Sequence, residues 1–280
     1  MLHKTLNIKG TLTSLDTPIV MGILNITPDS FYADSRKQTE AAIEERIQTI
    51  LSEGGQIIDI GGYSSRPNAA EVTTEEELER LIFALKIVNA HYPDVTVSVD
   101  TFRAQVARRV VEEYGVAMIN DISGGELDAD MFHTVAELNI PYVLMHMRGT
   151  PGTMQKLTGY TDMMGEIILY FSRKVRELHL LGVNDIILDP GFGFSKTVGQ
   201  NYELMKHLRE FGEFDLPLLV GISRKSMIYK FLGGTPDDSL NGTTVLNTVA
   251  LLNGADILRV HDVKEAVEAV KIINKLKVEN

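Results

Sequence analysis

Eight short apolar segments of this chain end in polar residues that could do chemistry. Asp100, Asn120 and Asp189 offer carboxylate and amide groups, which suit a flat heterocycle with several N–H donors. Lys225, Arg259 and His261 follow the last two segments and suit a phosphate or diphosphate, held by charge-assisted hydrogen bonds. The other segment ends are Asn25, Asp59 with Gly61 and Gly62, Asp121, His146 and Ser223.

Part of this set has a second explanation. Asp, Asn and Ser are favoured at helix N-caps and in turns, so any single one of them could simply begin the next helix. Lys225, Arg259 and His261 do not fit that explanation, because cations are unfavourable at helix N-termini. These three residues therefore favour an anion site.

The segments that must position these residues are apolar at nearly every position, as in parallel strands covered on both faces. We predict strands at Ile19–Asn25, Gln56–Gly61, Val95–Asp100, Ala117–Asp121, Pro141–Met147, Asp185–Asp189, Pro217–Ser223 and Asp256–His261. Helical patterns lie between them; one carries Leu78, Leu81 and Leu85 after an expected capping box of Thr74 and Glu77.

Strand followed by helix, repeated along the chain, predicts an α/β fold, a (β/α)₈ TIM barrel. Such barrels place their sites at the C-terminal rim and often bind phosphate after strands seven and eight. We expect a single domain over residues 1–280, because no linker or repeat divides the chain. Residues 1–18 predict a small hairpin under the barrel, with a loosely ordered arm as the alternative.

Composition excludes several classes. With 27 Lys plus Arg against 38 Asp plus Glu, the net charge is −11, which argues against a nucleic-acid partner. The chain has no Cys and hence no disulfide, thiolate-bound zinc or catalytic thiol. No apolar run is long enough for a signal peptide or membrane helix, so we expect a cytoplasmic protein with no membrane contact.

Several motifs are absent or incomplete. Gly191-Phe192-Gly193 lacks the third Gly of a dinucleotide fingerprint, and Lys196 lacks the preceding Gly of a nucleotide-binding P-loop. No HExxH occurs, which argues against a zinc hydrolase. We interpret His146 as a hydrogen-bonded barrel residue in preference to a metal ligand.

The segment ends and the residues around them resemble a known family. The strings MGILNITPDSF (21–31), DIGGYSSRP (59–67), SVDT (98–101), NDISGG (120–125), MHMRGTPGTMQ (145–155), DPGFGF (189–194), GISRKS (221–226) and RVHD (259–262) are similar to those of the dihydropteroate synthases. The match runs in order along nearly the whole chain, with a motif at each predicted strand end.

This resemblance implies a folate-pathway transferase that joins dihydropterin diphosphate to 4-aminobenzoate and releases diphosphate. Carried over by motif position, the pterin would be held by Asp100, Asn120, Asp189 and Lys225, and the diphosphate by Asn25, Ser65, Arg259 and His261. The aminobenzoate would lie near Arg66, Pro67, Phe194 and Ser226, and Asn25 would also be a ligand of Mg²⁺. The catalytic roles would fall on Asp34, Asp100 and Lys225.

The implied mechanism is dissociative: the C–O bond breaks first, Asp34 steadies the resulting cation, and the aromatic amine then attacks. The resemblance also implies a homodimer, and Ile228, Phe231, Leu246 and Val249 either form its face or belong to the core. We expect a sulfonamide target, although the chain departs from the family's GGESTRPG pattern at Tyr63, Ser65 and Asn68. The loop after Phe31 also differs from the family pattern, so the family's loop aspartate aligns either with Asp34 or with the residue next to it.

Two alternative functions are open. A methyltetrahydrofolate:corrinoid methyltransferase would share Asp100, Asn120 and Asp189, but it has no diphosphate to bind, so Asn25, Lys225, Arg259 and His261 count against it. A pterin-binding paralogue without catalysis would bind the ligand and form no product.

Overall fold

A parallel barrel of eight strands forms the centre of the structure. A computed structural model describes residues 3–26, 36–63 and 72–277. Within them, the sheet has the order β8-β7-β6-β5-β4-β3-β10-β9, and a bridge between Leu188 and Leu218 joins its two edges. This confirms the predicted barrel. The strands are β3 (Ile19–Asn25), β4 (Ile57–Gly61), β5 (Thr96–Asp100), β6 (Met118–Asp121), β7 (Tyr142–Met145), β8 (Ile186–Asp189), β9 (Leu219–Val220) and β10 (Ile257–Val260).

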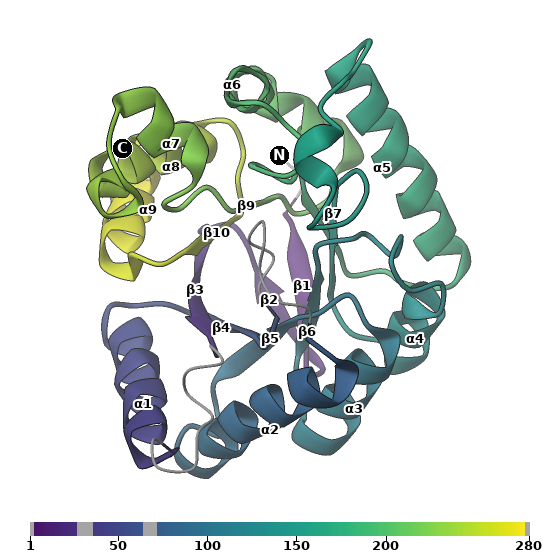
Figure 1. Cartoon of the computed structure of the whole chain (residues 1–280), viewed down its shortest axis with the longest axis vertical. Helices are drawn as coiled ribbons and strands as arrows, with labels where there is room; N and C mark the ends of the chain where they lie inside the picture. The colour runs from purple at the N-terminus through teal and green to yellow at the C-terminus, as the bar shows by residue number, and fades with distance from the viewer. Residues whose placement is uncertain (1–2, 27–35, 64–71, 278–280) are drawn as a thin grey trace.

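Helices follow the strands and surround the barrel (Figure 1). They are α1 (Arg36–Ser52), α2 (Thr74–His91), α3 (Ala104–Tyr114), α4 (Met131–Leu138), α5 (Met163–Leu180), α6 (Val198–Lys206), α7 (Ser226–Leu232), α8 (Leu240–Leu252) and α9 (Val263–Lys277). Short 3₁₀ helices are η3 (Met154–Lys156), η4 (Leu208–Phe214) and η5 (Pro236–Ser239). None of the helices in the described ranges is both long and apolar enough to span a membrane. The cytoplasmic location expected from the sequence stays a prediction.

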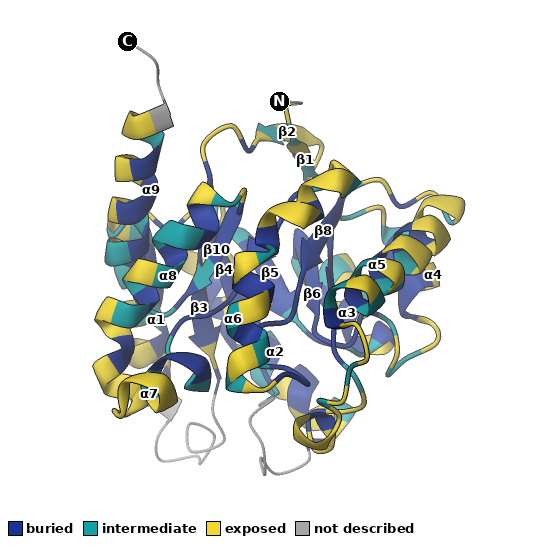
Figure 2. Ribbon diagram, turned by 90° about the horizontal axis from the view of Figure 1, so that it is seen from above, coloured by how far each residue is buried: buried dark blue, intermediate teal, exposed yellow. Residues whose placement is uncertain are grey.

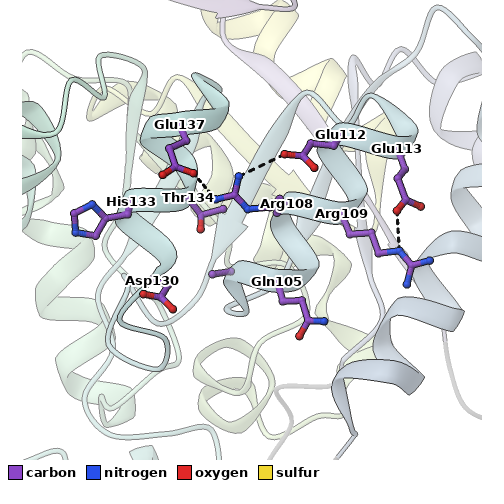
Figure 3. A pocket seen from close by; sticks show the side chains of 10 residues that line it. Gln105, Arg108, Arg109, Glu112, Glu113, Asp130, His133, Thr134 and Glu137 are labelled. Carbon is purple, nitrogen blue, oxygen red and sulfur yellow. Dashed lines mark hydrogen bonds and ion pairs between the residues drawn. The ribbon is translucent and has the colours of Figure 1, made fainter.

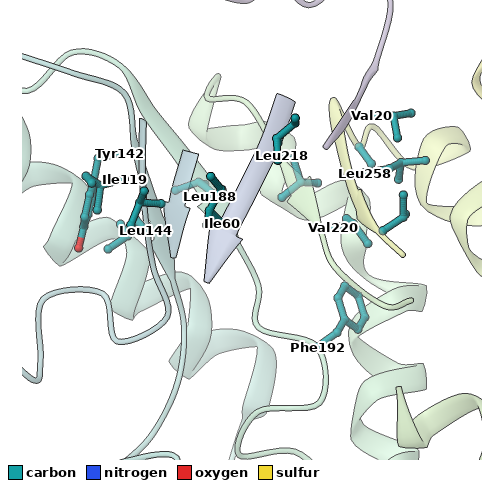
Figure 4. Close-up of a cluster of buried hydrophobic side chains, with 14 of the residues drawn as sticks. Val20, Ile60, Ile119, Tyr142, Leu144, Leu188, Phe192, Leu218, Val220 and Leu258 are labelled. Atoms are coloured by element: carbon teal, nitrogen blue, oxygen red, sulfur yellow. The ribbon is translucent and has the colours of Figure 1, made fainter. Parts of the chain in front are cut away.

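The strands are apolar on both faces because each face is covered. One set of side chains, which includes Val20, Ile60, Leu144 and Leu258, faces the helices and forms the larger core (Figure 4). The alternate positions form a smaller inner cluster with Ile57 and its neighbours Ile19, Met21, Met118, Val143, Ile187, Leu219 and Ile257. Burial on both sides explains why the strands read as continuous apolar runs.

The first residues form the predicted hairpin, β1 (Thr5–Ile8) and β2 (Thr11–Ser14), whose turn has positive φ at Lys9 and Gly10 as a type I′ turn requires. Leu6 and Leu15 extend the inner cluster. Lys4 Nζ lies 2.8 Å from Asp256 Oδ2, just before β10. The hairpin therefore covers the N-terminal end of the barrel, away from α7 (Figure 2).

Two local predictions were wrong in detail. The capping box of α2 uses Thr73 and Glu76, one residue earlier than expected, because the run Thr-Thr-Glu-Glu-Glu satisfies the motif in two registers. Glu77 is instead buried and ion-paired with Arg103. Strand β9 covers two residues where seven were predicted; Pro217, at its expected start, has no N–H to donate to a ladder.

Candidate active site

The inside of the barrel changes from apolar to polar toward the C-terminal ends of the strands. Ile57 belongs to the inner apolar cluster, so Asp59, two residues later, also faces inward. By the same alternation Asn120 follows Met118 on β6, and Arg259 follows Ile257 on β10. Polar residues from distant parts of the sequence therefore meet at one rim.

A buried network connects these polar residues. Asp59 Oδ2 accepts hydrogen bonds from Asn120 Nδ2 at 3.0 Å and from Arg259 Nε at 2.6 Å. Arg259 also donates to Asp100 Oδ2 at 2.8 Å. Arg259, predicted to hold diphosphate, thus contacts Asp100 directly and is connected to Asn120 through Asp59; both Asp100 and Asn120 are predicted to hold the ring. Asn120 gives its amide N–H to Asp59, which leaves its carbonyl oxygen as an acceptor for a ligand.

The carboxylates of the rim are less acidic than usual. Burial raises the pKa of Asp100 to about 7, the neighbouring carboxylates of Asp59, Glu77 and Asp121 add to the rise, and Arg259 opposes it. Burial also raises the pKa of Asp189, against the attraction of Lys225. In the free protein the charged form of each carboxylate is therefore unfavourable. Hydrogen bonds donated by a ligand would stabilise that form, so the rim favours a ligand with N–H or O–H donors.

Lys225 lies opposite Asp189 at the start of α7. Its Nζ donates to the carbonyl oxygen of Phe192 at 2.6 Å and lies 4.7 Å from the centre of the Phe194 ring. Burial lowers the pKa of Lys225 to about 8, while Asp189 favours its charged form. Lys225 thus adds a lysine donor to the acceptors of the rim.

His261 is uncharged at neutral pH. Burial and the neighbouring Arg259 lower its pKa to about 4, and its Nδ1 lies 3.1 Å from Ser223 Oγ. Arg46 of α1 donates to the backbone oxygens of His261 at 2.7 Å and of Ile23 at 3.1 Å. The lowered pKa favours the neutral form of His261 in the free protein, whereas the sequence analysis treats this residue as a cation.

An apolar wall stands beside the polar groups. Ile122 and Met145, at or just after the ends of β6 and β7, pack with Phe194, Met147 and Met154. A flat ring has apolar faces to cover and polar edges to satisfy, and this rim offers both kinds of surface.

The comparisons with known proteins agree with this geometry. A family model described as "Pterin binding enzyme" matches residues 21–261. The dihydropteroate synthase of Escherichia coli (strain K12) is 41% identical over 271 residues, which cover 95% of this chain and 94% of that protein. The crystal structure of the Yersinia pestis dihydropteroate synthase with a sulfonamide drug complex has a TM-score of 0.88 at 40% identity, covering 98% of this chain and 99% of that one. The Xanthomonas albilineans dihydropteroate synthase with 4-aminobenzoic acid has a TM-score of 0.89 at 34% identity, with full coverage of both chains (100% each).

The chain belongs to the dihydropteroate synthases. It is accordingly an enzyme, a transferase of folate synthesis with the pterin-binding fold. Most of the predicted site residues end a barrel strand or follow one closely, which places them on the same C-terminal side of the barrel: Asn25, Asp100, Asn120, Asp189, Phe194, Lys225, Ser226, Arg259 and His261. Asp34, Ser65, Arg66 and Pro67 lie outside the described residues, and their roles stay predictions.

Of the three departures from the usual dihydropteroate synthase pattern, Tyr63 lies within the described residues. Its ring meets that of Phe102 edge to face, with centroids 5.2 Å apart, and the Arg103 guanidinium lies 5.6 Å from its centre. An aromatic ring at this position therefore finds aromatic and cationic partners on the segment after β5.

Two groups at the polar rim were not assigned a role from sequence. Asp59 was noted only as a segment end, yet it joins Asn120 to Arg259 and keeps its Oδ1 buried without a partner among the described residues. Asp59 lies two residues after the inward-facing Ile57, and this spacing could have predicted that its side chain points into the barrel. Ile122 and Met145 carry no chemical signal of their own, because apolar residues at strand ends are common.

A hollow of about 490 Å³ lies between α3 and α4, on the outer layer of the dihydropteroate synthase barrel (Figure 3). Its charged side chains mainly pair with one another: Arg108 with Glu112 and Glu137, and Arg109 with Glu113. It contains none of the predicted site residues, so we do not assign the reaction to it.

Proposed function

We propose that the chain condenses (7,8-dihydropterin-6-yl)methyl diphosphate with 4-aminobenzoate, giving 7,8-dihydropteroate and diphosphate. The observation that carries this proposal is the joint placement of ring acceptors and a buried arginine at one rim: Asp100, Asn120 and Asp189 beside Arg259. The bound 4-aminobenzoic acid of the similar Xanthomonas albilineans enzyme supports the second substrate.

The acceptors are assigned to the pterin. Ionised Asp100 and Asp189, with the free carbonyl oxygen of Asn120, would accept hydrogen bonds from the ring N–H groups, and Lys225 would donate one. The wall with Ile122 and Met145 would cover a face of the ring. The site thereby orients the reacting methylene toward Arg259.

The diphosphate is assigned to Arg259, His261 and Asn25. The exposed Asn25 ends β3, and a Cβ added to the adjacent Gly61 would come within 3.3 Å of its Oδ1, so glycine keeps this oxygen accessible. The described residues contain no cluster of three or more metal-ligating side chains, and a single amide oxygen suits Mg²⁺, which is commonly held by one or two protein oxygens plus substrate phosphates and water. When bound, Mg²⁺ supplies positive charge that neutralises the diphosphate.

The reaction we propose is dissociative. The C–O bond breaks, the diphosphate leaves with its electron pair, and the dihydropterin ring delocalises the methylene cation. The neutral aromatic amine then forms the C–N bond and loses one proton. Arg259 stabilises the departing charge because its guanidinium is already held in place by Asp59 and Asp100.

An omission assay tests this function. We expect diphosphate and dihydropteroate to form only when the protein, the pterin diphosphate, 4-aminobenzoate and Mg²⁺ are all present. Binding of the pterin diphosphate without product would favour a paralogue that only binds pterin. Methyl transfer from methyltetrahydrofolate to a corrinoid would favour the methyltransferase.

In the same assay, we expect a sulfonamide to compete with 4-aminobenzoate and to raise the KM for 4-aminobenzoate at constant kcat.

Pterin binding is expected to weaken below neutral pH. Because the pKa of Asp100 is about 7 in the free protein, binding in acid must first remove its proton, so Kd should rise toward about tenfold per pH unit below 7. We would titrate with 6-hydroxymethylpterin, because a diphosphate itself titrates near pH 6. Asp100→Asn should bind more weakly and lose this dependence; an unchanged slope would contradict the assignment.

We also propose a homodimer formed through α7 and α8. Phe231 is 68% exposed, and Leu232, Val245 and Leu252 on the same two helices are also exposed. Ile228 is buried in the core, and Leu246 and Val249 are partly buried against it. Phe231→Glu should convert the dimer to a monomer in analytical ultracentrifugation. Leu180→Glu, at another exposed apolar residue on α5, is the control and should leave the dimer intact.

A further inference from the structure

Lys196 is a buried lysine to which the proposed reaction gives no role. Only 3% of it is exposed. Its Nζ lies 3.1 Å from His146 Nδ1, 3.0 Å from the Gly191 oxygen and 3.1 Å from the Phe194 oxygen. An ammonium has three N–H donors, so these three acceptors match it fully.

His146 is the neutral partner in this cluster. Burial holds its pKa well below the ordinary value, and the positive charges of Lys196 and Arg148 act in the same direction. In the tautomer that carries its proton on Nε2, the neutral ring can therefore accept from the ammonium at Nδ1. Around Lys196, Asp189 favours the charged form and Lys225 and Arg148 oppose it, while burial lowers its pKa to about 7.

The two carbonyl oxygens belong to one turn, Gly191 to Phe194. Phe194 N donates to the Gly191 oxygen at 3.1 Å, and Lys196 clamps the carbonyls at both ends of this turn. Gly191 has φ of +72°, and a Cβ there would lie 2.0 Å from the His146 oxygen. The turn thus packs against the residue that follows β7, and the Lys196 ammonium donates hydrogen bonds to two of its carbonyl oxygens.

The other side of the same turn faces the proposed site. Phe192 presents the oxygen that receives the Lys225 ammonium at 2.6 Å, and the Phe194 ring lies 4.7 Å from that ammonium. The places of the Lys225 ammonium and the Phe194 ring therefore depend on this four-residue turn, and Lys196 holds the carbonyls at both of its ends.

We propose that Lys196 is a positioning residue for the condensation, whose ammonium fixes the Gly191–Phe194 turn and thereby the places of Lys225 and the Phe194 ring. It contacts no substrate itself. This inference rests on the proposed function, because its effect is read in the rate of that reaction.

The absence of Cys from the chain allows a direct test. Lys196→Cys carries a single thiol, which can be alkylated in denaturant and the protein then refolded. Bromoethylamine would give a side chain with an ammonium close to the place of Nζ, and bromopropane an apolar side chain of the same shape. Wild-type protein taken through the same cycle is the reference. We expect the propyl form to lose about 10²-fold in kcat/KM for 4-aminobenzoate, and the aminoethyl form to recover most of it.

Two results would overturn the proposal. If the propyl form were as active as the aminoethyl form, the side chain would only fill space. If both forms stayed inactive beside an active refolded wild type, the ammonium would not suffice to hold the turn. Wild type that never forms product would instead refute the proposed function.

A second comparison avoids refolding. Lys196→Met should lower kcat/KM far more than Lys4→Met, a matched change at the opposite end of the barrel, where Lys4 pairs with Asp256. Lys4→Met should lower the unfolding temperature and leave kcat/KM unchanged. Equal kinetic effects at equal loss of stability would make Lys196 an ordinary structural residue.

Discussion

Replacing Asp189 by Asn should weaken pterin binding by about 10²-fold or more and leave the fold at least as stable as before. The loss follows from replacing charge-assisted hydrogen bonds, worth about 1.5–3 kcal/mol each, by weaker contacts and from adding a donor where the ring also donates. Stability is kept because burial raises the pKa of Asp189 and its charge is costly in the free protein. The Asn oxygen can still accept from Gly191 N, at 2.8 Å in the native protein. Fluorescence titration with 6-hydroxymethylpterin and thermal unfolding measure the two effects.

Asp121→Asn is the matched control. Asp121 is also a buried carboxylate at a strand end, but its bonds are internal: Oδ1 accepts from Ser123 N and Oγ at 2.7 Å, and Oδ2 accepts from Gly125 N at 2.8 Å and Tyr142 OH at 2.6 Å. The new NH₂ group would face a backbone N–H, which cannot accept. We expect a loss of about 1–3 kcal/mol in stability with unchanged pterin affinity. Similar behaviour of the two variants would contradict the division between a binding and a structural aspartate.

Arg259→Met should lower both kcat and stability. Loss of its positive charge at the departing diphosphate should reduce kcat by about 10²-fold or more. Asp59 and Asp100 would both lose the guanidinium that pairs with them, and breaking such a buried pair costs about 3–5 kcal/mol. Single-turnover kinetics and chemical denaturation check the two effects.

Adding Asp59→Asn to Arg259→Met separates these effects. The second change removes the Asp59 carboxylate that would be left without Arg259, while the new amide oxygen can still accept from Asn120. Part of the lost stability should return and kcat should stay low. Recovery of kcat in the double variant would show that Arg259 serves the fold alone and would refute its place at the diphosphate.

The elements of the barrel could be predicted where the local signal is strong. Strand β3 was predicted with its observed bounds, Ile19–Asn25, because a continuous apolar run stops at a polar residue before a Pro. The capping box was misplaced by one residue because its motif fits twice, and the choice depends on Glu77 being buried against Arg103. That contact joins α2 to the segment after β5 and cannot be seen in a local pattern.

The candidate site shows the same division. Residue types predicted the ring acceptors and the basic groups, and barrel topology predicted that they share one rim. The pairing of Arg259 with Asp59 and Asp100 was not predictable, because these residues are 200 and 159 positions apart in the sequence. The neutral state of His261 depends on burial and on Arg259, which residue type does not reveal.

The hairpin closes the barrel at the end opposite the site, and α9 runs back toward that same end (Figure 2). Attachment through either end of the chain would therefore leave the rim facing away from the support. A tag used to fix the enzyme to a sensor surface, or a second protein fused there, should not obstruct the approach of pterin or aminobenzoate. The catalytic constants of a tethered form should match those of the free enzyme.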